Sequence, residues 1–137
     1  EGRLTMYLVD TNVWLERLLA QERFDEVRRF LDATETSRLF LSDFSFHSIG
    51  LILTRLNKSG LLLNFVQDAL LEGAVSLVHL APEDMQAVVS VMQQFRLDFD
   101  DAYQYVAADK HHLVLVSFDA DFDRTEHGRK QPHQVTA

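Results

Sequence analysis

Short apolar runs alternate with longer amphipathic segments along the chain. The runs cover residues 6–9, 39–41, 75–80 and 113–116, and polar residues directly follow the first, second and fourth of them. Apolar runs of this length between helix-like segments are typical of strands that are buried in a parallel sheet. We therefore expect four strands, with helices between them.

The segments between the runs have apolar residues at helical spacing. One helix is expected from residue 43 toward 56 with Ser42 or Asp43 as its cap, a core helix over 61–71, and another helix over 101–110. This order favours a three-layer α/β/α sandwich, Rossmann-like, with a mostly parallel central sheet of four to five strands.

Aspartates follow the first and last expected strands directly. Asp10 closes the first strand, Asp119 follows the last, and Asp98, Asp100 and Asp101 open a helix between them. The carboxyl ends of parallel strands meet at the edge where open α/β sheets hold their ligands. Because clustered carboxylates repel one another, such a group usually holds a hard cation.

Each acid also has a simpler structural interpretation when it is taken singly. Asp10 and Asp98 could cap helices, and Asp119 and Asp121 could be ordinary turn residues. Three acids at three separate positions of one sheet edge make these interpretations less satisfactory, and a metal site is the stronger hypothesis.

Composition limits the classes of protein that fit. The 137 residues are 47% hydrophobic, which suits a single domain over 6–137, with residues 1–5 as a cloning remnant or upstream extension before Met6. The absence of cysteine excludes disulfides and thiolate chemistry. No apolar run approaches the roughly 18 residues of a membrane span, so we expect a cytoplasmic protein with no membrane partner.

The net charge of −8 argues against a protein that coats duplex nucleic acid with a broad positive face. It remains compatible with a nuclease, because divalent cations would offset the charge of the aspartates. Arg124, Arg129 and Lys130 make the last stretch locally basic, and a solvated tail and a phosphate-binding arm are both open interpretations.

Three motifs resemble those of the PIN-domain family and follow in the family's order. Asp10-Thr11-Asn12 closes an apolar strand, Asp101-Ala102 opens a helix, and Ser117-Phe118-Asp119 precedes Asp121-Phe122. The resemblance spans Tyr7 to about Phe122. It implies a PIN-like fold and a Mg²⁺- or Mn²⁺-dependent RNA endonuclease, commonly the VapC-like toxin of a toxin–antitoxin pair.

The resemblance also implies roles for individual residues. Three aspartates would be catalytic acids and metal ligands, with a fourth as an auxiliary metal ligand: Asp10, Asp101, Asp119 and, as the fourth, Asp121. Asn12 would orient Asp10 or contact the substrate. Ser117 would donate a hydrogen bond to a metal-binding side chain.

The chain departs from the family in the helix after the second strand. The family normally supplies a glutamate there, whereas residues 42–50 contain none. Ser48, or in second place His47, stands at the glutamate position, and Asp43 could substitute if its helix begins deeper in the cleft. His47 could instead contact phosphate or act as an acid or base. With fewer carboxylates the site would hold one cation more readily than two.

These observations favour a metal-dependent endoribonuclease that hydrolyses RNA phosphodiester bonds. An antitoxin protein and a second copy of the chain are its possible protein partners. The alternative is a catalytically weak PIN-like module that binds RNA or a protein. A haloacid-dehalogenase-like phosphatase would need an aspartate at Asn12, and a response-regulator receiver would need a lysine at Asp121.

Two groups of apolar residues allow both a core role and a binding role. The leucines of 61–63 and 70–71 exceed one buried helix face, so a wide core stripe or an interface is expected there. Phe44 and Phe46 could border the cleft as base-stacking residues, although aromatic residues more often pack in the core.

Overall fold

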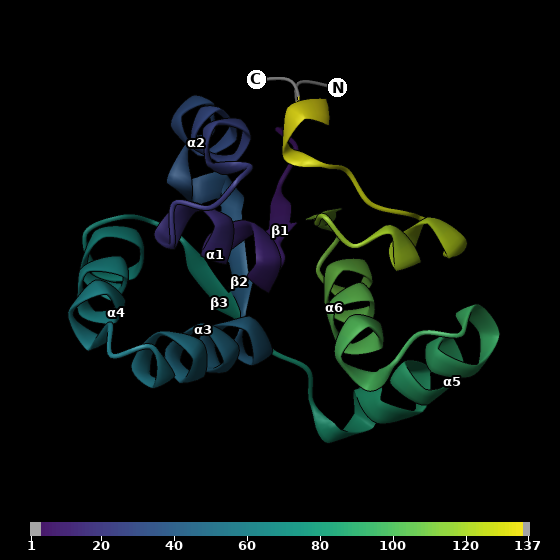
Figure 1. The fold of residues 1–137 in the computed structure, drawn as a ribbon. Helices are drawn as coiled ribbons and strands as arrows, with labels where there is room; N and C mark the ends of the chain where they lie inside the picture. Colours follow the sequence, from purple (N-terminus) through teal and green to yellow (C-terminus); the bar gives the residue numbers. More distant parts are fainter. Residues whose placement is uncertain (1–3, 136–137) are drawn as a thin grey trace.

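The computed structural model describes residues 4–135, which form one four-stranded parallel sheet with helices on both faces (Figure 1). The strands, in the order β3-β2-β1-β4 across the sheet, are β1 (Tyr7–Val9), β2 (Leu39–Ser42), β3 (Ser76–Val78) and β4 (Val114–Val116). This architecture confirms the predicted α/β/α sandwich. Part of the expected N-terminal extension, residues 1–3, lies outside the described residues.

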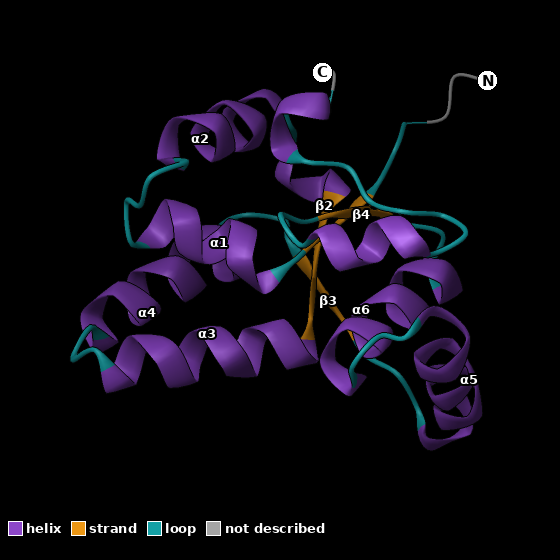
Figure 2. Cartoon of the chain, turned by 45° about the vertical axis from the view of Figure 1, so that its right-hand side comes forward, coloured by secondary structure: helices purple, strands orange, loops and turns teal. Residues whose placement is uncertain are grey.

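Six α-helices connect and cover the strands of the described chain (Figure 2). They are α1 (Thr11–Leu18), α2 (Phe24–Ala33), α3 (Asp43–Arg55), α4 (Ser59–Phe65), α5 (Met85–Phe95) and α6 (Phe99–Lys110). None of the helices found between residues 4 and 135 has the length and apolar character needed to cross a bilayer.

Alternation along β1 divides the core into two layers. Tyr7 and Val9 pack with the buried residues of α1 to α4, whereas Leu8 packs with those of α5 and α6 on the opposite face. Successive side chains of a strand point to opposite faces, so a wholly apolar strand requires cover on both sides. Figure 1 shows this division, with α5 and α6 on the side opposite α1 to α4. All neighbouring strands pair in parallel, so their carboxyl ends lie at the same edge of the sheet.

Two helix predictions needed correction. The single core helix expected over 61–71 is α4 followed by a π-helical turn, Val66–Leu71, in which the Glu72 N–H donates to the Gln67 carbonyl at 2.8 Å. Leu63 in α4 and Leu71 at the end of the π-helical turn are each 68% exposed, so the leucine-rich segment is only partly core. The helix expected to begin at residue 101 begins two residues earlier, capped by Asp98.

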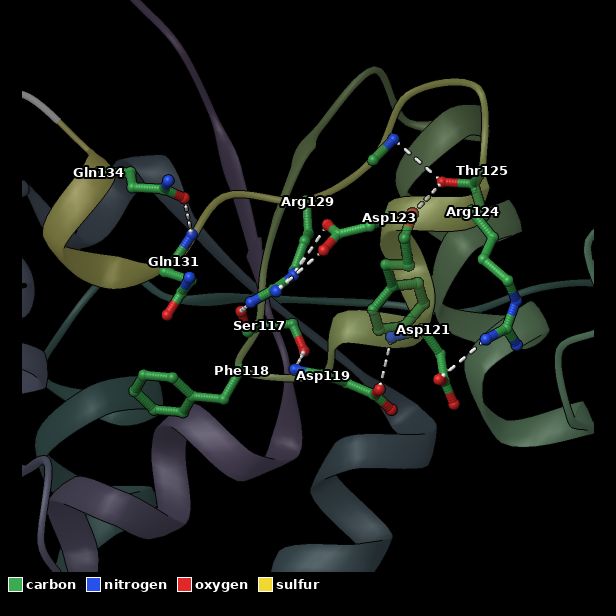
Figure 3. A network of polar contacts seen from close by, with 12 residues as sticks. Ser117, Phe118, Asp119, Asp121, Asp123, Arg124, Thr125, Arg129, Gln131 and Gln134 are labelled. Carbon is green, nitrogen blue, oxygen red and sulfur yellow. Dashed lines mark hydrogen bonds and ion pairs between the residues drawn. The ribbon is translucent and has the colours of Figure 1, made fainter.

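The basic C-terminal stretch packs on the domain, which corrects the expectation of a solvated tail. Lys130 pairs with Val116 as a parallel bridge beside β4. Arg129 forms an ion pair with Asp123, with its Nε 3.1 Å from Oδ1, and also donates to the carbonyl of Ser117 at 3.2 Å (Figure 3). These contacts hold the C-terminal stretch against the end of β4, directly after which three of the predicted site residues, Ser117, Asp119 and Asp121, lie.

Candidate functional site

An open cavity of about 340 Å³ lies where the strands end. The segment after β1, helix α3, the start of α6 and the segment after β4 line it with the residues Asp10, Thr11, Asn12, Leu15, Phe44, Ser48, Ile52, Asp98, Asp100, Asp101, Asp119 and Asp121. A larger cavity of about 430 Å³ between α6 and residues 127–130 shares none of these residues, and Asp109 is the one acid in its lining. The acids therefore identify the smaller cavity as the candidate site.

Asp10 is 6% exposed and is held by three donors. Its Oδ1 accepts hydrogen bonds from the backbone N–H of Thr11 at 2.9 Å and from Gln104 Nε2 at 2.8 Å. Its Oδ2 accepts from Ser117 Oγ at 2.7 Å. Burial raises the pKa of Asp10, and the hydrogen bonds from Ser117 and Gln104 act in the opposite direction. The side chain is thus fixed in orientation.

Gln104 is the residue that the sequence analysis missed. Its side chain is fully buried, and its Nε2 donates to Asp10 and also to Ser45 Oγ, at 2.9 Å. Its Oε1 accepts a hydrogen bond from Ser42 Oγ at 2.5 Å. It connects the ends of β1 and β2 through α6. Its place one helical turn after Asp101, within a mostly apolar stretch of α6, was the available signal.

Asn12 and Ser117 orient the segment after β4. The backbone N–H of Phe118 donates to Asn12 Oδ1 at 3.3 Å, and the N–H of Asp119 donates to Ser117 Oγ at 3.0 Å. Ser117 therefore connects the Asp119 backbone to the carboxylate of Asp10. Asn12 accepts a hydrogen bond from the Phe118 backbone and makes none with Asp10 among the described residues. Asn12 also lines the cavity, so its contact with a substrate stays a prediction.

Asp101, Asp119 and Asp121 each offer a carboxylate oxygen, and these oxygens lie within 4.8 Å of one another. Asp119 Oδ1 also accepts from the Asp121 N–H at 2.9 Å, which fixes the turn that presents both acids (Figure 3). Asp10 lines the same cavity but lies outside this closest group. Three hard oxygen donors at such separations suit a divalent cation such as Mg²⁺ or Mn²⁺.

The electrostatics of this group favour a cation. Burial, a hydrogen bond to Asp119 and repulsion from Asp119, Asp98 and Asp10 raise the pKa of Asp101 to about 8. In the absence of a cation, the raised pKa of Asp101 favours a proton shared between the carboxyl groups of Asp101 and Asp119 near neutral pH. A bound cation would replace this proton, so metal binding should release a proton and strengthen as pH rises.

The pKa of Asp101 predicts how the metal-free protein responds to pH. The unfolded carboxyl titrates near 3.8 and the folded one near 8, so the folded state binds more protons between these values. Its contribution to stability is present below about pH 4 and is lost as pH rises toward 8. Urea unfolding with a chelator should show this decline, and Asp101→Asn should flatten it. Parallel pH curves for the two proteins would contradict the assignment.

The three residues considered for the missing glutamate have different positions. Ser48 lines the cavity, whereas Asp43 and His47 do not. Because Ser42 caps α3, Asp43 is the first helical residue, and its Oδ1 accepts from the hydroxyl of Tyr103 at 2.8 Å. His47 is exposed on the next turn. Of the three residues, the structure therefore places only Ser48 in the lining of this cavity.

Residues 7–128 match the sequence profile of the PIN domain. This range includes most of the chain, and the chain belongs to the PIN domain family, as its three acidic motifs predicted. PIN domains are typically nucleases, and PIN nucleases generally use divalent metals. No relative among the curated proteins matches the chain.

Several solved structures share the fold. A toxin–antitoxin complex from Klebsiella pneumoniae has a TM-score of 0.74 at 18% identity, covering 94% of this chain and 99% of that one. The sarcin-ricin loop cleaving toxin VapC20 of Mycobacterium tuberculosis has a TM-score of 0.75 at 18% identity, with coverages of 92% and 99%. FitAcB from Neisseria gonorrhoeae has a TM-score of 0.70 at 21% identity, with coverages of 95% and 100%. At these identities the likeness establishes the fold alone.

Proposed function

We propose that this PIN domain is a metal-dependent endoribonuclease that hydrolyses RNA phosphodiester bonds. The observation that carries the proposal is the group of carboxylate oxygens of Asp101, Asp119 and Asp121, within 4.8 Å of one another, in the cavity that Asp10 also lines. Carboxylates at such distances repel one another, as the raised pKa of Asp101 indicates. A hard cation bound by these carboxylates would remove that repulsion, so the cluster is suited to be a metal site.

The roles of the acids follow from their contacts. Asp101, Asp119 and Asp121 would hold Mg²⁺ or Mn²⁺, and Asp10 would be the fourth acid, kept in orientation by Gln104 and Ser117. When bound, the cation supplies Lewis-acid stabilisation of charge on the phosphate and lowers the pKa of water. Ser117 positions the backbone of Asp119 relative to Asp10.

We further propose that the protein is the toxin of a VapBC-like pair, with an antitoxin protein and a second copy of the chain as partners in the cytoplasm. Support comes from the similar folds of a toxin–antitoxin complex from Klebsiella pneumoniae and of the toxin VapC20. A small open reading frame beside this gene that encodes a DNA-binding antitoxin would agree with this role. A solitary gene would favour a different biological setting for the same nuclease.

A second function has one specific observation in its favour. Ser48 lines the cavity where the family normally has a glutamate, so the site has one carboxylate fewer. A site with fewer ligands binds cations less tightly. This change would suit a catalytically weak PIN-like module that binds RNA or a protein.

A cleavage assay distinguishes the two functions. The protein is incubated with a mixture of structured and unstructured RNAs, with Mg²⁺, with Mn²⁺ and with a chelator. The nuclease proposal expects internal cleavage that needs the cation and returns when metal is added back. Retention of intact RNA on the protein without cleavage would support the binding module instead.

Ser48→Glu tests whether the missing carboxylate limits the site. Because Ser48 already faces the cavity, glutamate there should add a hard oxygen ligand and tighten Mn²⁺ binding about tenfold, with faster cleavage. Calorimetric titration with Mn²⁺ measures the affinity. Ser48→Gln provides the same shape without the charge, and Asp43→Asn tests an acid outside the cavity. Both should leave Mn²⁺ affinity near the wild-type value, and an equal gain in Ser48→Gln would argue against a ligand effect.

A further inference from the structure

The cavity offers RNA no cationic side chain among its described lining residues, which include six aspartates. Two arginines of the neighbouring segment are already engaged. Arg124 pairs with Asp121 at 3.0 Å and donates to the carbonyls of Phe95 and Arg96, and Arg129 pairs with Asp123. Contacts between basic side chains and phosphates usually dominate binding to nucleic acids. Here, apart from a bound cation, binding at the cavity must come from uncharged contacts.

Three aromatic rings form two successive ring pairs beside the acids, and these three rings are called the row below. Tyr103 pairs with both Phe44 and Phe99, with ring centroids 6.4 Å and 6.0 Å away and an angle of 51° between the planes in both pairs. Phe44 lines the cavity from α3. Phe99 is 47% exposed and lies in sequence between Asp98 and Asp100, which both line the cavity. Because the rings are tilted, neighbouring rings do not cover one another's faces completely.

The middle ring of this row is held in place. The Tyr103 hydroxyl donates to Asp43 Oδ1 at 2.8 Å and accepts from the Leu80 N–H at 3.0 Å. These bonds connect the start of α3, the first turns of α6 and the end of the β3 segment. Figures 1 and 2 agree that α3 and α6 begin side by side. A rigid ring loses little conformational entropy when a ligand packs against it.

We propose that Phe44, Tyr103 and Phe99 form a stacking surface for an unpaired base of an RNA strand whose adjoining phosphate lies at Asp101 and Asp119. This inference rests on the proposed ribonuclease function and adds to it a position where one base of the RNA strand binds. An uncharged base can approach the acids without the repulsion that a phosphate meets, and stacking tolerates any base. The row is flanked by aspartates, which favours a base over a docked apolar protein segment.

Phe99→Leu is the central variant, because leucine remains apolar but has no aromatic face. The probe is a fluorescent single-stranded RNA about ten nucleotides long, with Ca²⁺ as the hard cation to limit cleavage. Fluorescence anisotropy should show that Phe99→Leu binds this RNA about 5- to 100-fold more weakly than wild type. Phe99→Trp keeps an aromatic face and should bind about as tightly as wild type. An abasic ribose-phosphate strand of equal length should bind wild type and Phe99→Leu equally. Val89→Ala, at a side chain on α5 that is also 47% exposed, is the matched control.

The outcomes separate this inference from the function on which it rests. Wild-type cleavage of RNA combined with equal binding by Phe99→Leu would overturn the stacking surface and leave the nuclease intact. Failure of wild type to bind or cleave any RNA would overturn the nuclease proposal itself. If Phe99→Leu keeps RNA affinity and loses a protein partner, the row is a protein interface and the stacking surface is wrong. Melting curves should show that all variants fold, since Phe99 is half exposed.

Discussion

Asp119→Asn is expected to lower metal-dependent RNA cleavage about a thousandfold, because several kcal/mol of charge stabilisation depend on the bound cation. Asp119 is central to the acidic group, since it accepts from the Asp121 N–H and shares a hydrogen bond with Asp101. Asparagine keeps the shape and the acceptor oxygen while it removes the charge. Single-turnover cleavage with Mn²⁺ measures the loss of activity, and calorimetric titration with Mn²⁺ measures the loss of metal affinity.

Asp123→Asn is the matched control for that variant. Asp123 lies in the same short helical segment, but it pairs with Arg129 and does not line the cavity. We expect wild-type cleavage and Mn²⁺ affinity in this control. Wild-type Mn²⁺ affinity in Asp119→Asn would mean that the cation binds elsewhere.

The same variants distinguish a metal site from a structural cluster of acids. A cation that binds only the folded state raises the melting temperature by mass action. Wild type should therefore melt at a higher temperature with added Mn²⁺, and Asp119→Asn should show a smaller rise. Without metal the variant should be at least as stable as wild type, because it removes one of the repelling charges.

The fold could be predicted because its main signals are local. Tyr7, Leu8 and Val9 are all apolar and all buried, which requires a strand covered on both faces. The signal for the edge strand β3 was weaker. The sequence predicted a strand over 75–80, whereas β3 covers only Ser76–Val78, and Ser76 and Leu77 in it are exposed. The π-helical turn after α4 could not be predicted, because its residues are ordinary helix formers.

The candidate site was most directly predictable where strand ends fix positions. Asp10 and Asp119 follow strands of one parallel sheet, so topology alone brings them to the same edge. Along α3 the outcome depends on helical rotation of about 100° per residue, which turns Ser48 into the cavity and His47 out of it. The position of Gln104 one turn after Asp101 could mark it as a candidate, but its partners lie 59 to 94 positions away in sequence and could not be identified from the pattern of apolar and polar residues.

Gln104→Glu is expected to destabilise the protein by about 3 kcal/mol near neutral pH, or roughly 10 °C in melting temperature. Glutamate has the same shape, but it replaces the donating Nε2 by a carboxylate oxygen facing the buried Asp10, so that a donor is lost and a like charge is added. Burial beside Asp10 raises the pKa of the new carboxyl above its unfolded value, so stability falls as pH rises through the folded pKa. Urea unfolding at acidic and neutral pH should show the deficit narrow in acid.

The exchange variant Asp10→Asn/Gln104→Glu separates the structural and catalytic parts of this effect. The new amide at position 10 can then donate to the carboxylate at position 104, so the pair keeps one charge and one hydrogen bond across the same contact. Part of the lost stability should return, with a coupling energy of about 1–2 kcal/mol between the two positions. The double variant should not cleave RNA even where stability returns, because the carboxylate has left position 10. If the double variant is only as stable as the two single changes predict when added, the contact between Gln104 and Asp10 contributes little, and Gln104 acts through Ser42 and Ser45 instead.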